Sequence, residues 1–308
     1  MNSMKGLELA RAYYEAYGKP MIEKEFAEYA GRIAVGLAGE GSECFGFDDE
    51  LSRDHDFEAG FCLWLTPEDG EAIGFRLFRA YGKLPEEFQG VKKEKTSLFG
   101  GRRKGVMEIS EFYGNMIGCP GVPGEAEQWL AIPEYALAQA VNGEVFRDDL
   151  GEFSRIRNIL KKGYPEDVRL KKIAARAALM AQSGQYNYSR CRKRGEAGAA
   201  ALAAAEFVKA GISMVFLLNN RYTPYYKWML RAMGELPVLG WLRPSMERLL
   251  TEGGDGGPLI EEICGAVAKE LRRQGLTSGD WEYLEPHALS VTERIRDGAL
   301  RNLHLMEG

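Results

Sequence analysis

The chain has 308 residues, of which 45% are hydrophobic and 28% charged, the mixture of a folded globular protein rather than a disordered one. Its net charge of −5 argues against a surface built mainly to bind DNA or RNA, because such surfaces are strongly basic. The five cysteines are scattered without a CxxC pair and there are three histidines, so neither a disulfide framework nor a histidine-rich metal site is expected.

The N-terminal segment lacks the continuous apolar core of a signal peptide, and we expect a cytoplasmic protein. The stretch most like a membrane span runs over residues 197–218. It contains Glu206 and Lys209 and is mostly alanine up to Phe207. This composition favours a buried helix, so no membrane association is expected.

The first elements predicted along the chain are a helix, a strand, a turn and a second strand. Apolar residues at helical spacing predict helix within residues 1–30, and the apolar run at 33–37 predicts a buried strand. The sequence GEGS at 39–42, here called the glycine turn, ends this strand. Residues 54–65 predict the second strand, after which Thr66 is placed to cap a helix that begins at Pro67.

The next elements are a basic segment, two further strands and then helices alone. Residues 91–104 are basic and contain glycine, and they fit either a solvated loop or a lid over substrate. Strands are expected at 106–109 and 144–146, with a helix near 133–141 between them. Beyond residue 151 apolar residues repeat only at helical spacing.

This order predicts the fold class α/β + α. A small mixed-sheet domain with flanking helices should occupy residues 1–150, and an all-helical bundle should occupy residues 151–308 and complete a cleft. Ligand sites favour domain interfaces, so the active site is expected there.

The glycine turn and the acids that follow it form the pattern with chemical content. Backbone amides in a tight glycine turn can approach an anion closely, and Ser42 next to Gly41 adds a hydroxyl donor. Asp54 and Asp56 are two residues apart, so on a strand their carboxylates share one face. Two such oxygen ligands suit Mg²⁺, and a pair of ions could clamp an in-line phosphoryl displacement.

The arrangement of a strand, GS, a loop and DxD resembles the DNA polymerase β-type nucleotidyltransferase superfamily. That resemblance implies a third carboxylate on a later strand, for which Glu108 is the choice and Glu58 the competitor. Residues 143–148 are similar to the closing strand of antibiotic-modifying nucleotidyltransferases. SRDHDF at 52–57 and RYTPYYKW at 221–228 resemble a bacterial group known as domain of unknown function family 4037, with a likeness over most of the chain.

Several features admit two interpretations. Glu40 beside Gly41 would oppose phosphate if it pointed inward, so it should point outward or help to bind metal. His55 should face away from the two aspartates. The basic residues 190–194 fit a surface turn or, through Arg192 and Arg194, a phosphate contact from a long helix that they open. Tyr225 and Lys227 fit either partial core or a base-stacking ring and a phosphate-binding cation.

Other nucleotide-binding patterns are absent from the sequence. The glycines at 36, 39 and 41 have the order GxxGxG rather than GxGxxG, and no GxxxxGK[ST] or GxSxG occurs. This excludes a dinucleotide fingerprint, a P-loop and a nucleophile elbow.

The expected function is a nucleotidyltransferase that moves a nucleoside monophosphate from a triphosphate, with ATP the expected donor, to a hydroxyl. Pyrophosphate leaves, two Mg²⁺ ions act as cofactors, and Lys227 with Arg192 or Arg194 neutralises the leaving group. The acceptor is open: a small molecule or a protein is expected before tRNA, and no DNA partner is expected. The alternatives are a catalytically silent nucleotide sensor on the same fold and a helical interaction protein.

Overall fold

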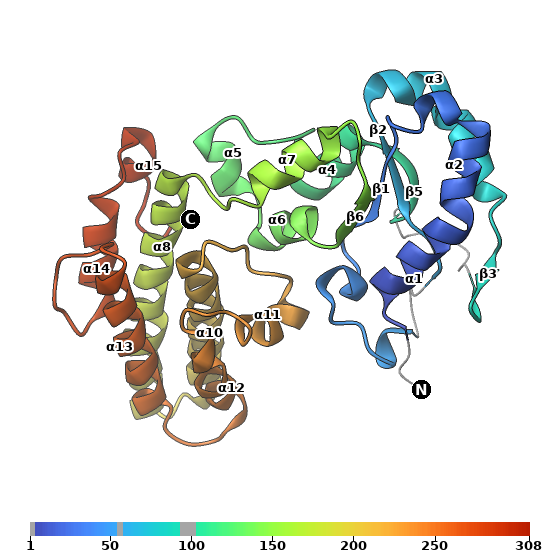
Figure 1. Cartoon of the computed structure of the whole chain (residues 1–308). Coiled ribbons are helices and arrows are strands. Elements are labelled where there is room, and N and C mark those ends of the chain that lie inside the picture. Colours follow the sequence, from blue (N-terminus) through green and yellow to red (C-terminus); the bar gives the residue numbers. More distant parts are fainter. Residues whose placement is uncertain (1–3, 54–57, 93–102) are drawn as a thin grey trace. The chain divides into compact units, whose positions relative to one another are not determined.

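The computed structural model describes residues 4–53, 58–92 and 103–308 (Figure 1). The chain forms two compact units. The first comprises Met1–Val122 and Ala136–Lys161, and the second Pro123–Tyr135 and Lys162–Gly308. The division is therefore not a single cut near residue 150. The short segment Pro123–Tyr135 belongs to the second unit because helix α5 (Ala126–Ala131) contacts helix α8 (Glu166–Met180).

A four-stranded mixed sheet forms the centre of the first unit, with strand order β5-β2-β1-β6. Strand β1 is antiparallel to both β2 and β6, whereas β2 is parallel to β5. The strands are β1 (Ala34–Leu37), β2 (Cys62–Leu65), β5 (Gly105–Glu108) and β6 (Glu144–Arg147). Each lies where the sequence predicts a strand, and of the segment expected at 54–65 the described strand is its last part.

Helices cover both faces of this sheet. On one face Leu63 and Leu65 of β2 join a core with Tyr13 and Ile22 from the N-terminal helices. On the other face the ring of Trp64 stacks on Phe153, with ring centroids 3.8 Å apart. Successive side chains of a strand point to opposite faces, so an uninterrupted apolar run such as Cys62–Leu65 requires cover on both sides.

The first unit contains the following helices and minor elements in addition to the sheet. They are α1 (Gly6–Tyr13), η1 (Tyr14–Gly18), α2 (Lys19–Glu25), η2 (Ala27–Tyr29), η3 (Ser42–Phe45), η4 (Leu51–Arg53), α3 (Pro67–Gly82), β3 (Glu87–Phe88), β4 (Val91–Lys92), α4 (Ile109–Ile117), the greater part of α6 (Glu134–Val141) and α7 (Glu152–Leu160). The start of α3 confirms the predicted cap: Thr66 accepts a hydrogen bond from the amide of Asp69, and Pro67 occupies the first turn.

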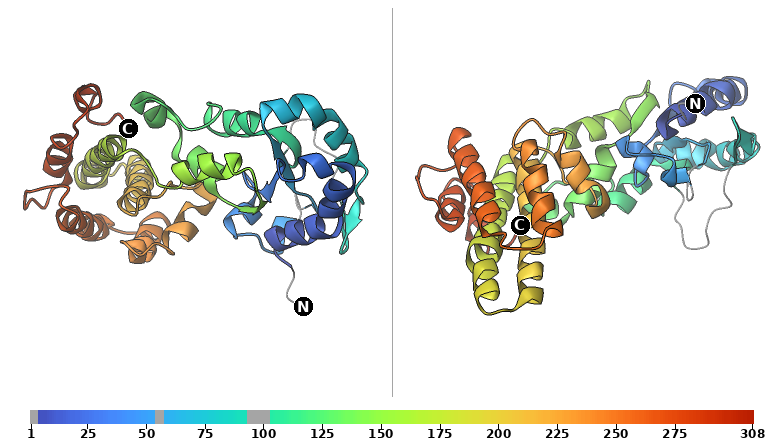
Figure 2. Two further views of the ribbon diagram at one scale, coloured as in Figure 1. Left: turned by 45° about the horizontal axis from the view of Figure 1, so that its top comes forward. Right: turned by 90° about the horizontal axis from the view of Figure 1, so that it is seen from below.

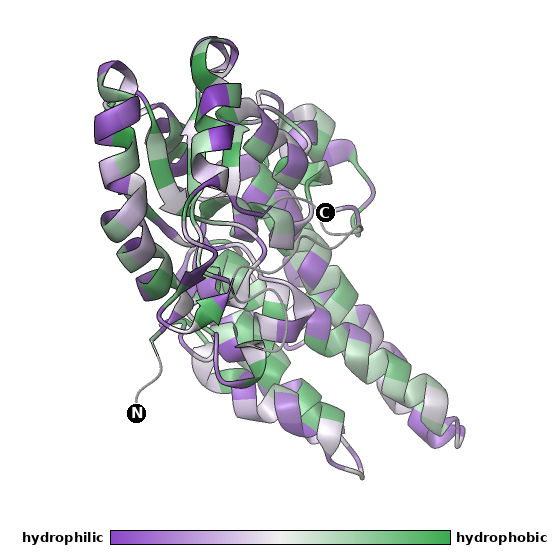
Figure 3. Ribbon diagram, turned by 90° about the vertical axis from the view of Figure 1, so that its right-hand side faces the viewer, coloured by the Kyte–Doolittle hydropathy of each residue, from purple (hydrophilic) through white to green (hydrophobic). Residues whose placement is uncertain are grey.

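The second unit is all helical, as predicted for the C-terminal half (Figure 2). Hydrophobic and hydrophilic residues both occur along the helices of the chain (Figure 3). Besides α5 and α8, the helices of the second unit are η5 (Ala181–Tyr188), α9 (Ser189–Lys193), α10 (Ala197–Leu218), α11 (Tyr226–Met233), η6 (Gly240–Leu242), α12 (Arg243–Thr251), α13 (Gly257–Arg273), α14 (Leu284–Thr292) and α15 (Gly298–Asn302).

Helix α10 is the one helix in the described part of the chain that is long and apolar enough to cross a membrane. Within its most apolar window, 67% of the residues are buried inside the protein. It packs against α8, η5 and α12. This burial agrees with the prediction of a core helix at 197–218.

Candidate functional site

The glycine turn follows β1 directly and is held by a side chain from a distant part of the first unit. Gly39 has φ of +121°, a backbone conformation that favours glycine. The side-chain oxygen of Asn142 accepts a hydrogen bond from the amide of Gly39 at 2.8 Å, and its Nδ2 donates to the carbonyl of Gly39 at 2.6 Å. This pair of bonds fixes the turn. Sequence reasoning missed Asn142, since nothing local marks it.

A buried arginine in turn holds the segment that carries Asn142. Nη2 of Arg157, on α7, donates to the carbonyls of Asn142 and Gly143, each at 2.8 Å. The amide of Gly143 donates to the carbonyl of Cys44 at 2.7 Å, on the far side of the turn. Burial lowers the pKa of Arg157, although a guanidinium remains charged at any physiological pH. The turn is thus positioned by two successive layers of hydrogen bonds.

Two acidic side chains lie beside the glycine turn. Glu40 is half-exposed and forms an ion pair with Arg103 at 3.6 Å, as expected for an outward orientation. The carboxylate of Glu43 instead packs against Gly41, so closely that a Cβ atom added there would overlap it. The negative charge of Glu43 therefore lies beside Gly41 and opposes the approach of an anion to this side of the turn unless a cation offsets it.

The predicted metal ligands Asp54 and Asp56 lie outside the described residues, as do His55 and most of the basic segment 91–104. Among the residues that are described, no group of three or more potential ligands forms a metal site. The sheet nevertheless shows where the chain enters β2. Cys62 pairs with Gly36, at the end of the sheet where β1 leads into the glycine turn.

The structure does not bring Glu108 to the glycine turn. Strand β5 runs parallel to β2, with Gly105 beside Cys62 and Glu108 beside Leu65, so Glu108 lies at the opposite end of the sheet. The register places Leu65 and Glu108 level with Ile33, which precedes Gly39 by six residues. At about 3.3 Å per extended residue, Glu108 is about 20 Å from the glycine turn. Glu108 is also the residue that precedes α4, and its carboxylate accepts a hydrogen bond from Ser110 at 3.1 Å.

The competing acid, Glu58, precedes β2 in the chain and so lies toward the end where β1 leaves the sheet. Its backbone carbonyl accepts a hydrogen bond from Nζ of Lys104 at 2.8 Å. Ser42, Glu43 and Glu58 carry oxygen atoms of the kind that suits Mg²⁺, but within the part of the chain that the structure describes they do not form a metal-binding group.

The predicted site residues of the second unit do not gather at one place within that unit. Tyr225 lines a cavity of about 420 Å³. Lys227 is exposed and does not line this cavity; its ammonium lies 5.1 Å from the centre of the Trp228 ring. Arg192 and Arg194 are exposed at the end of α9, which residues 190–194 close rather than open, and neither lines the cavity.

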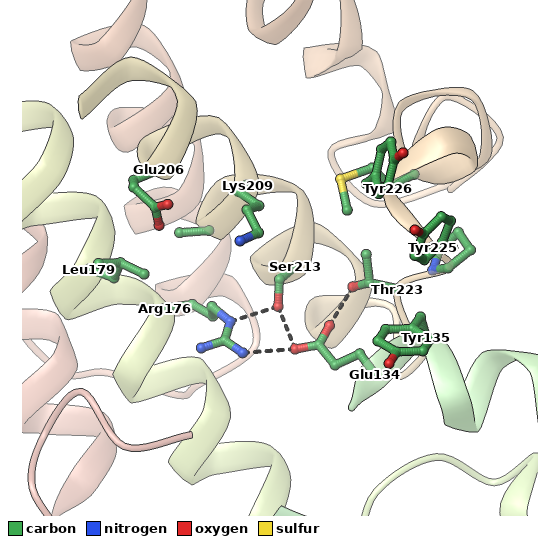
Figure 4. Close-up of a pocket in the computed structure, with 13 residues that line it drawn as sticks. Glu134, Tyr135, Arg176, Leu179, Glu206, Lys209, Ser213, Thr223, Tyr225 and Tyr226 are labelled. Atoms are coloured by element: carbon green, nitrogen blue, oxygen red, sulfur yellow. Dashed lines mark hydrogen bonds and ion pairs between the residues drawn. The ribbon is translucent and has the colours of Figure 1, made fainter. Parts of the chain in front are cut away.

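A buried polar network forms one wall of this cavity (Figure 4). The carboxylate of Glu134 accepts hydrogen bonds from Arg176 at 3.0 Å, from Ser213 at 2.7 Å, and from Thr223. Nε of Arg176 also donates to the hydroxyl of Ser213 at 2.8 Å. Burial acts to raise the pKa of Glu134, but the positive charges of Arg176 and Lys172 and the hydroxyl hydrogen bonds outweigh it, and the pKa is lowered.

Comparison with known proteins finds similarity to a family model and to solved structures. Residues 129–229 match a domain of unknown function, DUF4037, and this segment contains Glu134 and all three of its hydrogen-bond partners. The expected likeness is thus found for RYTPYYKW at 221–228, while the match does not extend to 52–57. No curated protein matches the chain.

Among solved structures the chain is similar to a nucleotidyltransferase-like protein from Exiguobacterium sibiricum 255-15. The identity is 11% and the TM-score 0.34, over 86% of this chain and 76% of that one.

Proposed function

We propose that the chain is a magnesium-dependent nucleotidyltransferase that moves a nucleoside monophosphate from a triphosphate, with ATP the expected donor, to a hydroxyl acceptor. One observation carries the proposal. Strand β1 leaves the sheet into a glycine turn that Asn142 holds in place, and β2 enters the sheet at the same end, six residues after Asp56. In the sequence, a turn of the kind that can bind an anion therefore follows β1, and the pair of acids precedes β2.

The proposed reaction is an in-line displacement at the α-phosphorus. The acceptor oxygen forms a bond to that phosphorus, the bond to the bridging oxygen breaks, and pyrophosphate leaves with the electron pair. Amides of the glycine turn and the hydroxyl of Ser42 bind the triphosphate. Asp54 and Asp56 would hold Mg²⁺, which neutralises phosphate charge when bound.

The third carboxylate takes the acceptor proton or completes the metal site. Glu108 is the residue that the resemblance implies and Glu58 its competitor. The sheet register favours Glu58, because Glu108 lies at the opposite end of β2. Lys227, Arg192 and Arg194 remain the cations that the sequence predicts for pyrophosphate. The net charge of −5 favours a small-molecule or protein acceptor over tRNA.

The proposal is tested with α-phosphate-labelled triphosphates and a cell extract, with and without Mg²⁺. The wild type should transfer label to one fraction of the extract, and Asp54→Asn combined with Asp56→Asn should abolish transfer while the melting temperature stays within about 2 °C. A large loss of folding in the double variant would show that these acids are structural, and label transfer that persists in it would refute the assignment.

Glu58→Gln and Glu108→Gln form a matched pair within the same assay. We expect the first to reduce transfer by at least about 100-fold and the second by less than about threefold, because one mispositioned acid or base group is worth about 10²–10⁴-fold. A large loss of transfer in Glu108→Gln with little loss in Glu58→Gln would show that Glu108 is the third carboxylate. It would contradict the choice of Glu58 from the sheet register.

A catalytically silent nucleotide sensor is the second candidate, and the separation of Glu108 from the glycine turn favours it. It predicts that ATP with Mg²⁺ raises the melting temperature of the wild type while no label is transferred to any fraction. Absence of both effects would exclude the two candidates together.

A further inference from the structure

The cavity in the second unit contains two charges that the fold leaves unpaired. Glu206 and Lys209 both lie on α10 and line the cavity, and Figure 4 shows their side chains projecting toward it. Neither has a hydrogen bond or an ion pair with any residue that the structure describes. Residues three apart on a helix are neighbours on its surface, so the cavity offers one positive and one negative group about one turn apart.

The other charges at the cavity are already neutralised within the protein. Glu134 and Arg176 pair with each other and are bound by the hydroxyls of Ser213 and Thr223. The charge available to a ligand is therefore that of Glu206 and Lys209 alone, which sums to zero. A ligand that satisfies both groups carries an ammonium and a carboxylate and has no net charge.

The mouth of the cavity is aromatic. Tyr135 and Tyr225 are each 43% exposed and Tyr226 is 69% exposed, and the three rings form one group, with Tyr225 in contact with both of the others. Exposed aromatic rings that lie together favour the burial of a further ring against them. Leu179 and Met229 add apolar surface. The volume of about 420 Å³ is within the range of about 300–1,000 Å³ that is typical of small-molecule pockets.

We propose that this cavity binds a zwitterionic aromatic small molecule, of the class of a free aromatic amino acid. Its ammonium pairs with Glu206, its carboxylate pairs with Lys209, and its ring packs on the tyrosines. The Glu134 network forms a rigid wall, since every member is held by at least one other. All of these residues belong to the second unit, so the site requires neither Mg²⁺ nor a triphosphate.

The test is calorimetric titration of the full-length chain without Mg²⁺, using four probes that differ by one group each. L-phenylalanine has all three groups, 3-phenylpropionate lacks the ammonium, phenethylamine lacks the carboxylate, and L-alanine lacks the ring. We expect L-phenylalanine to bind and each of the other three to bind at least about 10-fold more weakly. A charge-assisted bond contributes about 1.5–3 kcal/mol and burial of the ring about the same, which is about 10- to 150-fold in affinity.

Variants assign each group of the ligand to its partner. Lys209→Met should weaken L-phenylalanine and 3-phenylpropionate at least about 10-fold but leave phenethylamine unchanged, and Glu206→Gln should weaken L-phenylalanine and phenethylamine but not 3-phenylpropionate. Lys269→Met, an exposed lysine on α13 outside the cavity, is the control and should change nothing.

Two further outcomes decide the matter. No binding of L-phenylalanine at millimolar concentration, or equal binding of 3-phenylpropionate, overturns the proposal. Displacement of L-phenylalanine by ATP would assign the tyrosines to the nucleobase and would also overturn it. Repeating the titration with the Asp54→Asn, Asp56→Asn variant separates the two proposals, because amino-acid binding should persist there even if nucleotidyl transfer is lost.

Discussion

Removal of the Glu134 carboxylate should destabilise the second unit by about 3 kcal/mol. The side chains of Glu134 and Arg176 are 11% and 18% exposed, so Glu134→Ala leaves a largely buried guanidinium without its counter-charge. Breaking one partner of a buried ion pair costs about 3–5 kcal/mol. The residual exposure places the value at the lower end, and three lost hydrogen bonds at about 1 kcal/mol each give the same figure.

The assay is urea unfolding followed by tryptophan fluorescence, since four of the five tryptophans lie in the second unit. Glu134→Gln should cost about 1–2 kcal/mol, because the amide can still accept hydrogen bonds but cannot neutralise Arg176. Glu252→Ala removes a surface pair with Arg248, in which the arginine is 53% and the glutamate 55% exposed, and serves as the control with an expected loss below about 1 kcal/mol.

The double variant Glu134→Ala, Arg176→Met decides whether the loss comes from the unpaired charge. It should recover at least about 1 kcal/mol relative to the sum of the two single changes, since methionine leaves no charge to desolvate. Strict additivity, or a loss below about 1 kcal/mol for Glu134→Ala alone, would refute the reasoning. The contribution of the charged carboxylate should also decline as pH falls below about 4.5 and be lost as pH falls through the pKa of Glu134 in the folded protein, which lies below the ordinary value of 4.5.

Two further predictions concern backbone fit and pH. Gly143→Ala should destabilise the first unit by more than about 3 kcal/mol in urea unfolding, because a Cβ there would lie 2.0 Å from the carbonyl oxygen of Leu37 at φ of +66°. Gly90→Ala, at φ of +80° with no atom within 4 Å, should cost only about 1 kcal/mol, and equal losses would contradict the role of the close approach. Burial lowers the pKa of Lys172 from 10.5 to about 8, so the unfolded chain binds more protons above pH 8, and stability should rise by roughly 1–2 kcal/mol between pH 8 and 9.5. Lys172→Met should remove most of that rise, and an unchanged slope would show that Lys172 is not responsible.

The local structure around the candidate site was predictable in detail. The apolar run at 33–37 and the sequence GEGS at 39–42 predict a buried strand and a turn, and β1 with a positive φ at Gly39 confirms both. Thr66 and Pro67 predict the start of α3. These features depend on interactions within a few residues, so the chemistry of adjacent side chains is enough to predict them.

The position of Glu108 shows where this reasoning fails. An acid on a strand can be assigned to one face of that strand from its periodicity, but not to one end of the sheet. The end of the sheet at which an acid lies depends on which strand its own strand pairs with, and on whether the pair is parallel or antiparallel. Parallel pairing of β5 with β2 places Glu108 beside Leu65 rather than beside Cys62.

By itself, the sequence determined the order of the elements, the division into a mixed-sheet part and a helical part, and the placement of the glycine turn at the end of a buried strand. Tertiary structure alone decided that Asn142 holds Gly39, and that Glu134, Arg176, Ser213 and Thr223 form one network. The physical reason is that backbone propensity and hydrophobic periodicity act over one or two turns of chain. The hydrogen bonds in these two groups join residues that are separated along the sequence by 103, 42, 79 and 89 positions. They form only after the core has brought distant segments together.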